Sequence, residues 1–166
     1  SCDKGELPVP PRVPGNVQSD QVQMGTDYRE VIYYDLHSGE IINTHLKTDW
    51  DLGFESVDDG WTIRLNTSKA MRAAKTDAIW FSEVTDASGV DWGWDVHSGN
   101  SDSTAIGDWR DEQKVYIIDL GYSLSGLNSL GFMKVKLEEI DNGYRLIYAN
   151  LSDVDSSVVE ILKDPN

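Results

Sequence analysis

Short runs of alternating apolar and polar residues recur along most of the chain, with turn-forming residues between them. Alternation with a period of two is typical of β-strands that bury one face. The first two runs, residues 31–36 and 41–46, flank a segment that contains Ser38-Gly39, a favourable pair for a hairpin turn. We therefore expect the folded region to begin with a β-hairpin.

The same pattern predicts further strands over residues 50–56, 61–67, 78–85, 90–97, 115–121, 131–140 and 144–151. Turn residues at Asp58-Asp59-Gly60 and Asp141-Asn142-Gly143 separate neighbouring runs. Only residues 67–75 have a helix-forming composition, with Ser68 as a candidate cap. The chain is thus predicted to be all-β, a single domain of antiparallel strands with little helix.

The N-terminal segment has a different character, because four of the five prolines lie within residues 8–14. Proline restricts its own backbone and pushes the preceding residue toward extended conformations. We expect residues 1–16 to form a tether and residues 17–166 to form the domain. The single cysteine, Cys2, follows a small residue, as in bacterial lipoproteins, so it is a candidate lipidation site. An unmodified thiol in a terminal tail is the alternative.

Charge and hydropathy limit the partners that the protein can have. The net charge of −15 and the pI of about 4.3 oppose binding to a phosphate backbone, so nucleic acid is not an expected partner. No apolar run approaches the roughly 18 to 20 residues that a membrane-spanning helix needs. Any attachment to a membrane is therefore expected only through a lipid anchor at Cys2.

The sequence offers little support for catalysis, since it contains neither G-x-S-x-G nor H-E-x-x-H. One basic segment does stand out in this acidic chain. Residues 64–75 contain no acidic residue and four cations, together with the thioether of Met71; the cations are Arg64, Lys69, Arg72 and Lys75. This segment is either a local anion site or a basic stretch that balances acidic neighbours.

Tryptophan is unusually frequent, with six copies in 166 residues. Trp92 and Trp94 are expected on one face of a strand, with His97 near its end. They could form an aromatic wall for a planar ligand or a sugar, with His97 at its rim, or they could pack in the core. Trp50 and Trp61 lie on neighbouring expected strands and are predicted to be structural.

Three stretches resemble the HmuY family of Bacteroidetes surface lipoproteins: V-I-Y-Y-D-L-H-S-G-E-I-I-N (residues 31–43), T-D-W-D-L-G-F-E (48–55) and W-T-I-R-L-N-T-S (61–68). The most specific matches are Trp50-Asp51 and Arg64-Leu65-Asn66, and the resemblance covers about residues 28–151. It implies an all-β fold and the capture of haem by two axial side chains, His or Met. It also implies delivery of haem to an outer-membrane haem receptor.

On this resemblance His97 corresponds to one axial position, and Met71 is the nearest usable second ligand, since thioethers can ligate haem iron. His37 and His45 are possible substitutes. Trp92 and Trp94 would line the site, and the four cations of residues 64–75 would pair with the propionates. The implied protein is a lipid-anchored, non-enzymatic haem-binding protein of the outer membrane and cell surface, used in iron acquisition. The alternative is a HmuY-like surface module that binds carbohydrate or a protein partner without haem.

Overall fold

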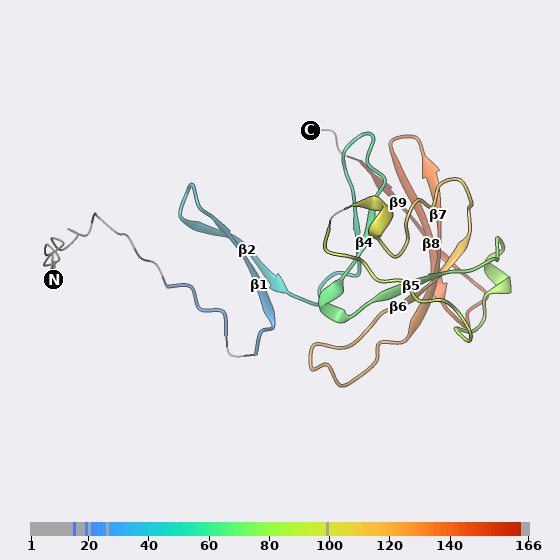
Figure 1. Cartoon of the computed structure of the whole chain (residues 1–166), viewed down its shortest axis with the longest axis horizontal. Coiled ribbons are helices and arrows are strands. Elements are labelled where there is room, and N and C mark those ends of the chain that lie inside the picture. The colour runs from blue at the N-terminus through green and yellow to red at the C-terminus, as the bar shows by residue number, and fades with distance from the viewer. Residues whose placement is uncertain (1–14, 16–18, 20, 26, 99, 164–166) are drawn as a thin grey trace, which may run out of the picture.

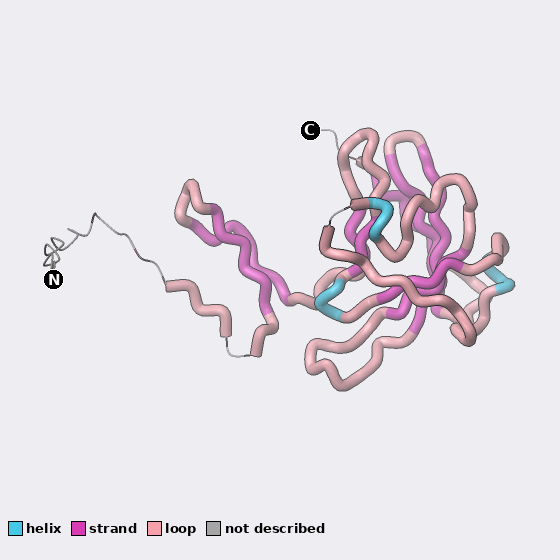
Figure 2. Tube along the Cα trace, in the orientation of Figure 1, coloured by secondary structure: helices cyan, strands magenta, loops and turns pink. Residues whose placement is uncertain are grey.

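A computed structural model describes residues 15, 19, 21–25, 27–98 and 100–163. Cys2 and the tether predicted over residues 1–16, apart from Gly15, lie outside the described residues. The described part consists of antiparallel strands, three short 3-10 helices and loops (Figures 1 and 2), which confirms the predicted all-β fold. None of its helices is long and apolar enough to cross a membrane.

The largest sheet has five antiparallel strands in the order β5-β6-β7-β8-β9. They are β5 (Arg72–Lys75), β6 (Val115–Asp119), β7 (Phe132–Ile140), β8 (Gly143–Asn150) and β9 (Ser157–Leu162). The β7–β8 hairpin turns at the predicted place, because Ile140 pairs with Gly143 and Asn142 has a left-handed backbone with φ 59°. Gly143 is required there, since any Cβ would collide with the carbonyl of Ile161 on β9.

The inner face of this sheet carries the main core and is covered by a two-stranded sheet of β3 (Leu52–Phe54) and β4 (Ile63–Leu65). The rings of Trp61, Trp109 and Tyr144 meet there at centroid distances between 5.0 and 5.9 Å. Trp61 is therefore structural, as predicted. Trp50 was also predicted to be structural, but it lies just before β3, is 38% exposed and does not pack against the core.

Lys163 connects the end of β9 to the turn that follows β3. Its side chain is buried, and its Nζ donates to the carbonyls of Asp58 at 2.9 Å and Gly60 at 2.6 Å. The same Nζ lies 3.4 Å from the ring centroid of Trp61. Its backbone N–H donates to Asn142 at 2.8 Å. This one residue thus stabilises two turns that are distant in sequence.

The outer face of the five-stranded sheet packs against residues 76–92, where a strand was predicted over residues 78–85. That prediction is wrong, because the segment forms loops and the 3-10 helix η2 (Phe81–Glu83). Lys134, a buried residue of β7, donates from Nζ to the carbonyls of Phe81 at 3.1 Å and Val84 at 2.9 Å. These carbonyls bond to a side chain instead of a neighbouring strand, which the sequence pattern cannot reveal.

Two other expected elements also change. The helix expected over residues 67–75 is only the 3-10 helix η1 (Thr67–Lys69), after which β5 pairs with β6, so tertiary pairing overrides local helix propensity. The strand expected over residues 90–97 reduces to one bridge between Gly93 and Ala73. A further 3-10 helix, η3 (Ser101–Ser103), lies in the polar loop that follows.

The predicted N-terminal hairpin is confirmed as β1 (Glu30–Asp35) and β2 (Glu40–Leu46), which project from the rest of the structure (Figure 1). Residues 30–46 are called the arm, and residues 47–163 the body. In the described part of the chain, β1 and β2 pair only with each other. Among the described residues, no strand pairs with the outer edges of the arm and no second layer covers it.

Candidate functional site

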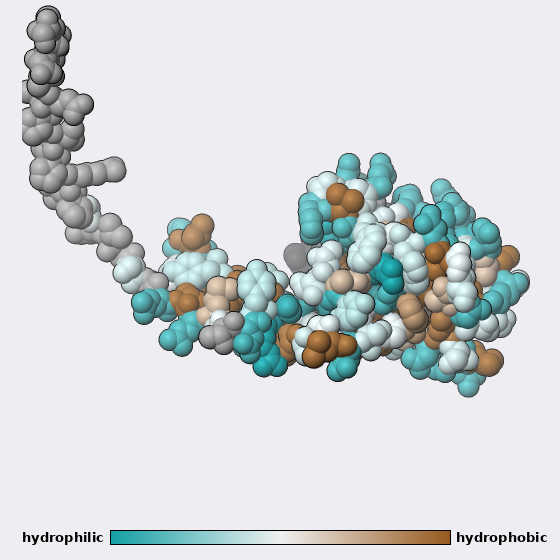
Figure 3. Space-filling view, turned by 60° about the horizontal axis from the view of Figure 1, so that its bottom comes forward, coloured by the Kyte–Doolittle hydropathy of each residue, from teal (hydrophilic) through white to brown (hydrophobic). Residues whose placement is uncertain are grey.

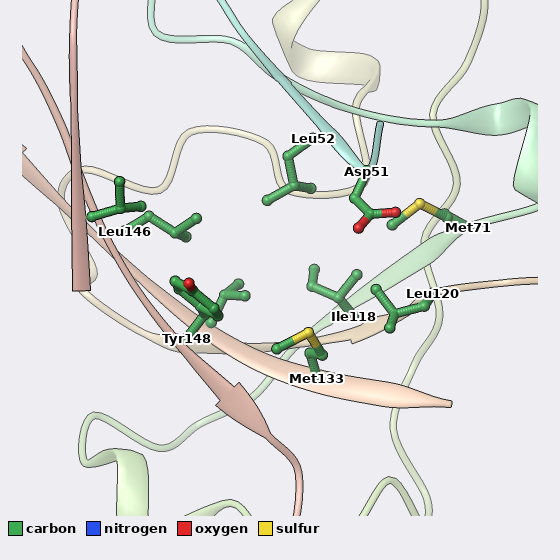
Figure 4. Close-up of a pocket in the computed structure, with 10 residues that line it drawn as sticks. Asp51, Leu52, Met71, Ile118, Leu120, Met133, Leu146 and Tyr148 are labelled. Atoms are coloured by element: carbon green, nitrogen blue, oxygen red, sulfur yellow. The ribbon is translucent and has the colours of Figure 1, made fainter. Parts of the chain in front are cut away.

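A cavity of about 340 Å³ lies in the body between the inner face of the large sheet and the start of β3 (Figure 4). Its walls are almost entirely apolar and come from Leu52, Met71, Ile118, Leu120, Met133, Val135, Leu146, Tyr148 and Val159. The one carboxylate on its wall belongs to Asp51. Such an apolar, partly open cavity with few polar groups is typical of a small-ligand site.

Two methionines reach this apolar cavity from either side of β6: Met133 from β7, and Met71 from the position just before β5. Met133 on β7 pairs with Ile118, which also pairs with Ala73 on β5, and Met71 lies two residues before Ala73. Because side chains alternate along a strand, all four point to the inner face. Figure 4 shows both sulfur atoms at the cavity. The cavity therefore presents two soft, polarisable ligand atoms.

One of the four predicted cations is close to this cavity. Lys69 is buried and forms an ion pair with Asp51, whose side chain is half exposed. A buried ammonium needs a counter-charge, because it has lost most of its hydration. An acidic group of a ligand could take the place of Asp51 as this partner. The wall of the cavity thus carries one half of a buried ion pair.

The aromatic residues predicted for the site lie on the other face of the sheet. Gly93 is paired with Ala73, whose side chain points inward with that of Met71, so Trp92 and Trp94 point outward. Trp92 stacks on Phe132 with centroids 5.8 Å apart. The sheet therefore separates the tryptophans from Met71, and the structure does not bring them to one cavity.

The other three predicted cations lie away from the apolar cavity. Arg72 donates from Nε at 2.9 Å and from a terminal nitrogen at 2.8 Å to Asp119, and its guanidinium lies 4.7 Å from the centroid of Trp92. Lys75 pairs with Glu112 at 3.0 Å. Arg64 is exposed on β4. These three do not line the apolar cavity.

The histidines also lie away from this cavity. His97 is exposed in a turn after the Gly93 bridge and is not among the lining residues. His45 lies on the arm, with its Nε2 3.1 Å from the hydroxyl of Tyr33, and His37 is exposed in the turn of the arm. Among the residues that the structure describes, no group of three His, Cys, Asp or Glu side chains could hold a metal ion. The iron ligands that the cavity wall offers are the thioethers of Met71 and Met133, the Asp51 carboxylate and the Tyr148 hydroxyl.

Met133 is the site residue that sequence reasoning missed. The alternation of Met133, Val135 and Leu137 placed all three on one face of an expected strand, and this signal was readable. Alternation could not predict the cavity, because a gap between two layers of the fold depends on residues that are far apart in the sequence. Met71 was selected for its place in the basic segment, and the structure places it on the cavity wall.

A β-sheet body with an open apolar cavity, soft ligand atoms and a charged rim is the architecture of a small-ligand-binding protein. The chain belongs to the HmuY family: the family model, described as HmuY protein, matches residues 27–158. This membership associates it with haem-related proteins of the cell surface. No curated protein and no solved structure matches the chain significantly.

Proposed function

We propose that this protein is a non-enzymatic haem-binding protein of the cell surface, anchored in the outer membrane through lipid on Cys2, which passes haem to an outer-membrane receptor. Membership of the HmuY family supports the haem relation. The Ser1-Cys2 pair and the prolines that follow support the anchor and the tether. The observation that carries the proposal is the apolar cavity with two thioether side chains on its wall.

The residues of this cavity fit the chemistry of haem. An apolar macrocycle needs an apolar slot, and the walls supply mostly aliphatic side chains, the Tyr148 ring and a single carboxylate. Its iron accepts thioether sulfur, which Met71 and Met133 supply. Bound haem would supply the iron centre that is carried. The protein's own residues bind the ring, exclude water from it and position the sulfur atoms.

The propionates of haem need a cation near the opening. Lys69 is the cation best placed for this role, because it pairs with Asp51 on the cavity wall. Arg72 and Lys75 are less suited, because their carboxylate partners, Asp119 and Glu112, do not line the cavity. Binding through Lys69 would release Asp51 to solvent, where a carboxylate is well hydrated. The exchange replaces one ion pair by another and leaves no buried charge unpaired.

A second placement of haem uses the residues first selected from sequence. His97 would supply an axial nitrogen on the outer side of the sheet, beside Trp94, which is half exposed, and Arg72, whose guanidinium is 5.5 Å from the Trp94 centroid. In this placement Met71 would not contribute, because it points to the inner face. The two placements therefore make opposite predictions for single substitutions.

Haemin titration of the apoprotein, followed through the Soret band, tests both placements. Met71→Leu and Met133→Leu keep the volume and apolarity of the cavity and remove the sulfur. Each is expected to lose the low-spin spectrum of the wild type and to weaken haemin binding at least about tenfold, the equivalent of ~1.4 kcal/mol. Met24→Leu is the matched control, since Met24 is exposed in the N-terminal segment, and its titration should equal that of the wild type.

The contradicting outcomes are distinct. Loss of binding in His97→Ala but in neither methionine variant would move haem to the outer face. An absence of saturable binding by the wild type at micromolar haemin would reject haem altogether. The alternative, adhesion to carbohydrate or a protein partner, would then be the better account, because Trp80 and Trp94 present exposed rings.

The lipid anchor is tested separately by mass spectrometry of the protein isolated from its own cells. An N-terminal peptide in which Cys2 carries several acyl chains is expected, because one chain alone gives only marginal attachment. An unmodified Cys2 thiol would exclude the anchor. This result would leave the haem titration unaffected, so the two parts of the proposal can fail independently.

A further inference from the structure

The connection between β6 and β7 differs from the rest of the chain in charge. Residues 120–133 contain no acidic or basic residue, and no other uncharged run in the sequence is longer than seven residues. Charged residues make up 26% of the chain, so a run of this length is unusual. Its middle part, residues 121–131, forms an exposed loop. We call it the leucine loop, because it contains Leu124, Leu127 and Leu130.

The leucine loop is held in shape by bonds between its two sides. The backbone N–H of Ser123 donates to the carbonyl of Asn128 at 2.9 Å, and the N–H of Leu130 donates to the carbonyl of Gly121 at 2.9 Å. Leu127 lies at the tip that these bonds close, and it is 84% exposed. Leu130 is 42% exposed. The loop therefore presents apolar side chains to its surroundings on a fixed frame.

The leucine loop lies at the end of the body from which the arm and the N-terminal segment leave. Its residues Leu124 and Ser125 line a hollow together with Asp27 and Arg29 of that segment. Figure 1 shows the connection between β6 and β7 near the junction with the arm, and Figure 3 shows hydrophobic residues on the surface there. The 25 residues that lead from Asp27 back to Cys2 span at most about 90 Å. The loop is therefore within reach of a surface that holds Cys2.

Size and charge favour lipid over protein as the partner of the leucine loop. Each side of a stable protein interface contributes about 20 to 30 residues, more than the 11 residues of this loop. The neighbouring Asp27 and Arg29 are charged and leave Leu127 exposed. A lipid surface needs only a few apolar side chains without charge, and it favours Tyr at the level of the headgroups. Tyr122, 49% exposed at the base of the loop, meets that preference.

We propose that the leucine loop docks on the membrane that carries the lipid of Cys2, with Leu127 inserted at the boundary between headgroups and acyl chains. This inference rests on the proposed lipid anchor, because a tethered body stays close to the lipid surface and a weak contact is then sufficient. Insertion is shallow, about 5 to 10 Å, so the backbone of the loop can bond to headgroup oxygens. Docking fixes which end of the body faces the membrane.

Hydrogen exchange of the full-length protein coupled to vesicles tests the docking. Cys2 is the only cysteine, so a maleimide lipid in zwitterionic phosphatidylcholine vesicles attaches the chain at Cys2 alone. The reference is the same protein coupled to a soluble maleimide polymer. Amides of residues 121–131 are expected to exchange at least about tenfold more slowly on the vesicles, because insertion restricts their access to bulk water.

Two matched substitutions test the role of Leu127. Leu127→Asp places a charge at the tip of the loop and is expected to remove the slowing on vesicles. Val154→Asp places the same charge in the turn between β8 and β9, where Val154 is 86% exposed, and should keep the slowing. Unchanged exchange in β6, β7 and β8 of both variants verifies that they are folded.

Three results would overturn the proposal. Equal exchange of the loop on vesicles and on the polymer would show that it does not dock on lipid. Slowing that persists in Leu127→Asp, or that is lost to the same extent in Val154→Asp, would place the membrane contact elsewhere. Because the lipid is attached chemically, none of these results depends on the native lipidation of Cys2 or on the haem titration.

Discussion

The arm and the body are built from the same kind of strand and differ in what covers it. Ile41 on β2 and Ile118 on β6 both lie in antiparallel strands, yet Ile41 is 48% exposed and Ile118 is 2% exposed. In the body, β3 and β4 cover one face of the large sheet and residues 76–92 cover the other. No such layer covers the arm in the part of the chain that the structure describes. Alternation therefore predicts that a strand forms, whereas burial is decided by a second layer from elsewhere in the chain.

The difference predicts that stability resides in the body, and Trp109→Ala is the strongest test. Trp109 is 1% exposed, packs against Trp61 and Tyr144, and donates from Nε1 to the carbonyl of Trp61 at 3.1 Å. Its removal is expected to lower the free energy of unfolding by about 3 to 5 kcal/mol. Urea unfolding monitored by circular dichroism measures the loss.

Trp80→Ala is the matched control, since Trp80 is 66% exposed and should change the free energy of unfolding by less than about 0.5 kcal/mol. Equal losses in the two variants would show that the covered face of the sheet does not dominate stability. The arm and the body would then differ in shape but not in how burial contributes to their stability.

The joint between the two regions gives a smaller effect. Asn66→Ala removes both amide donors and the Oδ1 that accepts from the N–H of Ser68 at 3.0 Å, and it leaves two carbonyls without these bonds. The expected loss is about 1 to 3 kcal/mol. Hydrogen exchange is expected to accelerate in residues 47–51, because the arm can then move relative to the body. Asn43→Ala on the arm should leave that exchange unchanged.

The smallest effect at neutral pH is expected from Tyr116→Phe. In the described part of the chain the buried Tyr116 hydroxyl has no hydrogen-bond partner, so its removal should change stability at pH 8 very little. Burial, with the charges of Glu112 and Asp108 as lesser causes, raises the pKa of Tyr116 to about 12. The unfolded chain loses this proton near pH 10 and the folded chain near pH 12, so stability falls between these values.

Tyr116→Phe should therefore lose less stability than the wild type between pH 8 and pH 11, as measured by urea midpoints. Burial also raises the pKa of Tyr144 to about 12, so part of the alkaline loss remains. Tyr144→Phe differs at pH 8, because its hydroxyl donates to Glu55 at 2.8 Å and removal is expected to cost about 1 kcal/mol. If Tyr116→Phe loses as much stability as the wild type between pH 8 and pH 11, the raised pKa of Tyr116 is not a cause of the alkaline loss.

Sequence reasoning predicted the strands that depend on local pattern. The arm and the β7–β8 hairpin lie almost where alternation and turn residues placed them. It failed in the loop after β5, where the Lys134 side chain bonds to backbone carbonyls that a neighbouring strand would otherwise pair with. It also failed at β5 itself, where pairing with β6 overrides the helix-forming composition of the segment. β9 was missed, and its strand character comes from pairing with β8 at one edge of the sheet.

The candidate site was predictable only in part. Met71 and Lys69 could be selected from the basic segment, but their relation to Met133 and Asp51 arises from contacts across layers. Trp92 and Trp94 do share a face, as predicted, and that face is opposite to the one that carries Met71. Period-two alternation specifies relative faces within a strand. It does not specify which face of a sheet borders a cavity.

The contact of Lys163 with the turn at residues 58–60 also has a consequence for the timing of folding. The residues that it joins are separated by 103 and 105 positions in the chain. At a synthesis rate of about 5 to 20 residues per second, Gly60 leaves the ribosome roughly 5 to 20 s before Lys163. Until then the Trp61 ring lacks the nearer of its two cations and the carbonyl of Asp58 lacks the Lys163 donor. The contact that ties β9 to this turn therefore forms only after almost all of the described chain has been synthesised.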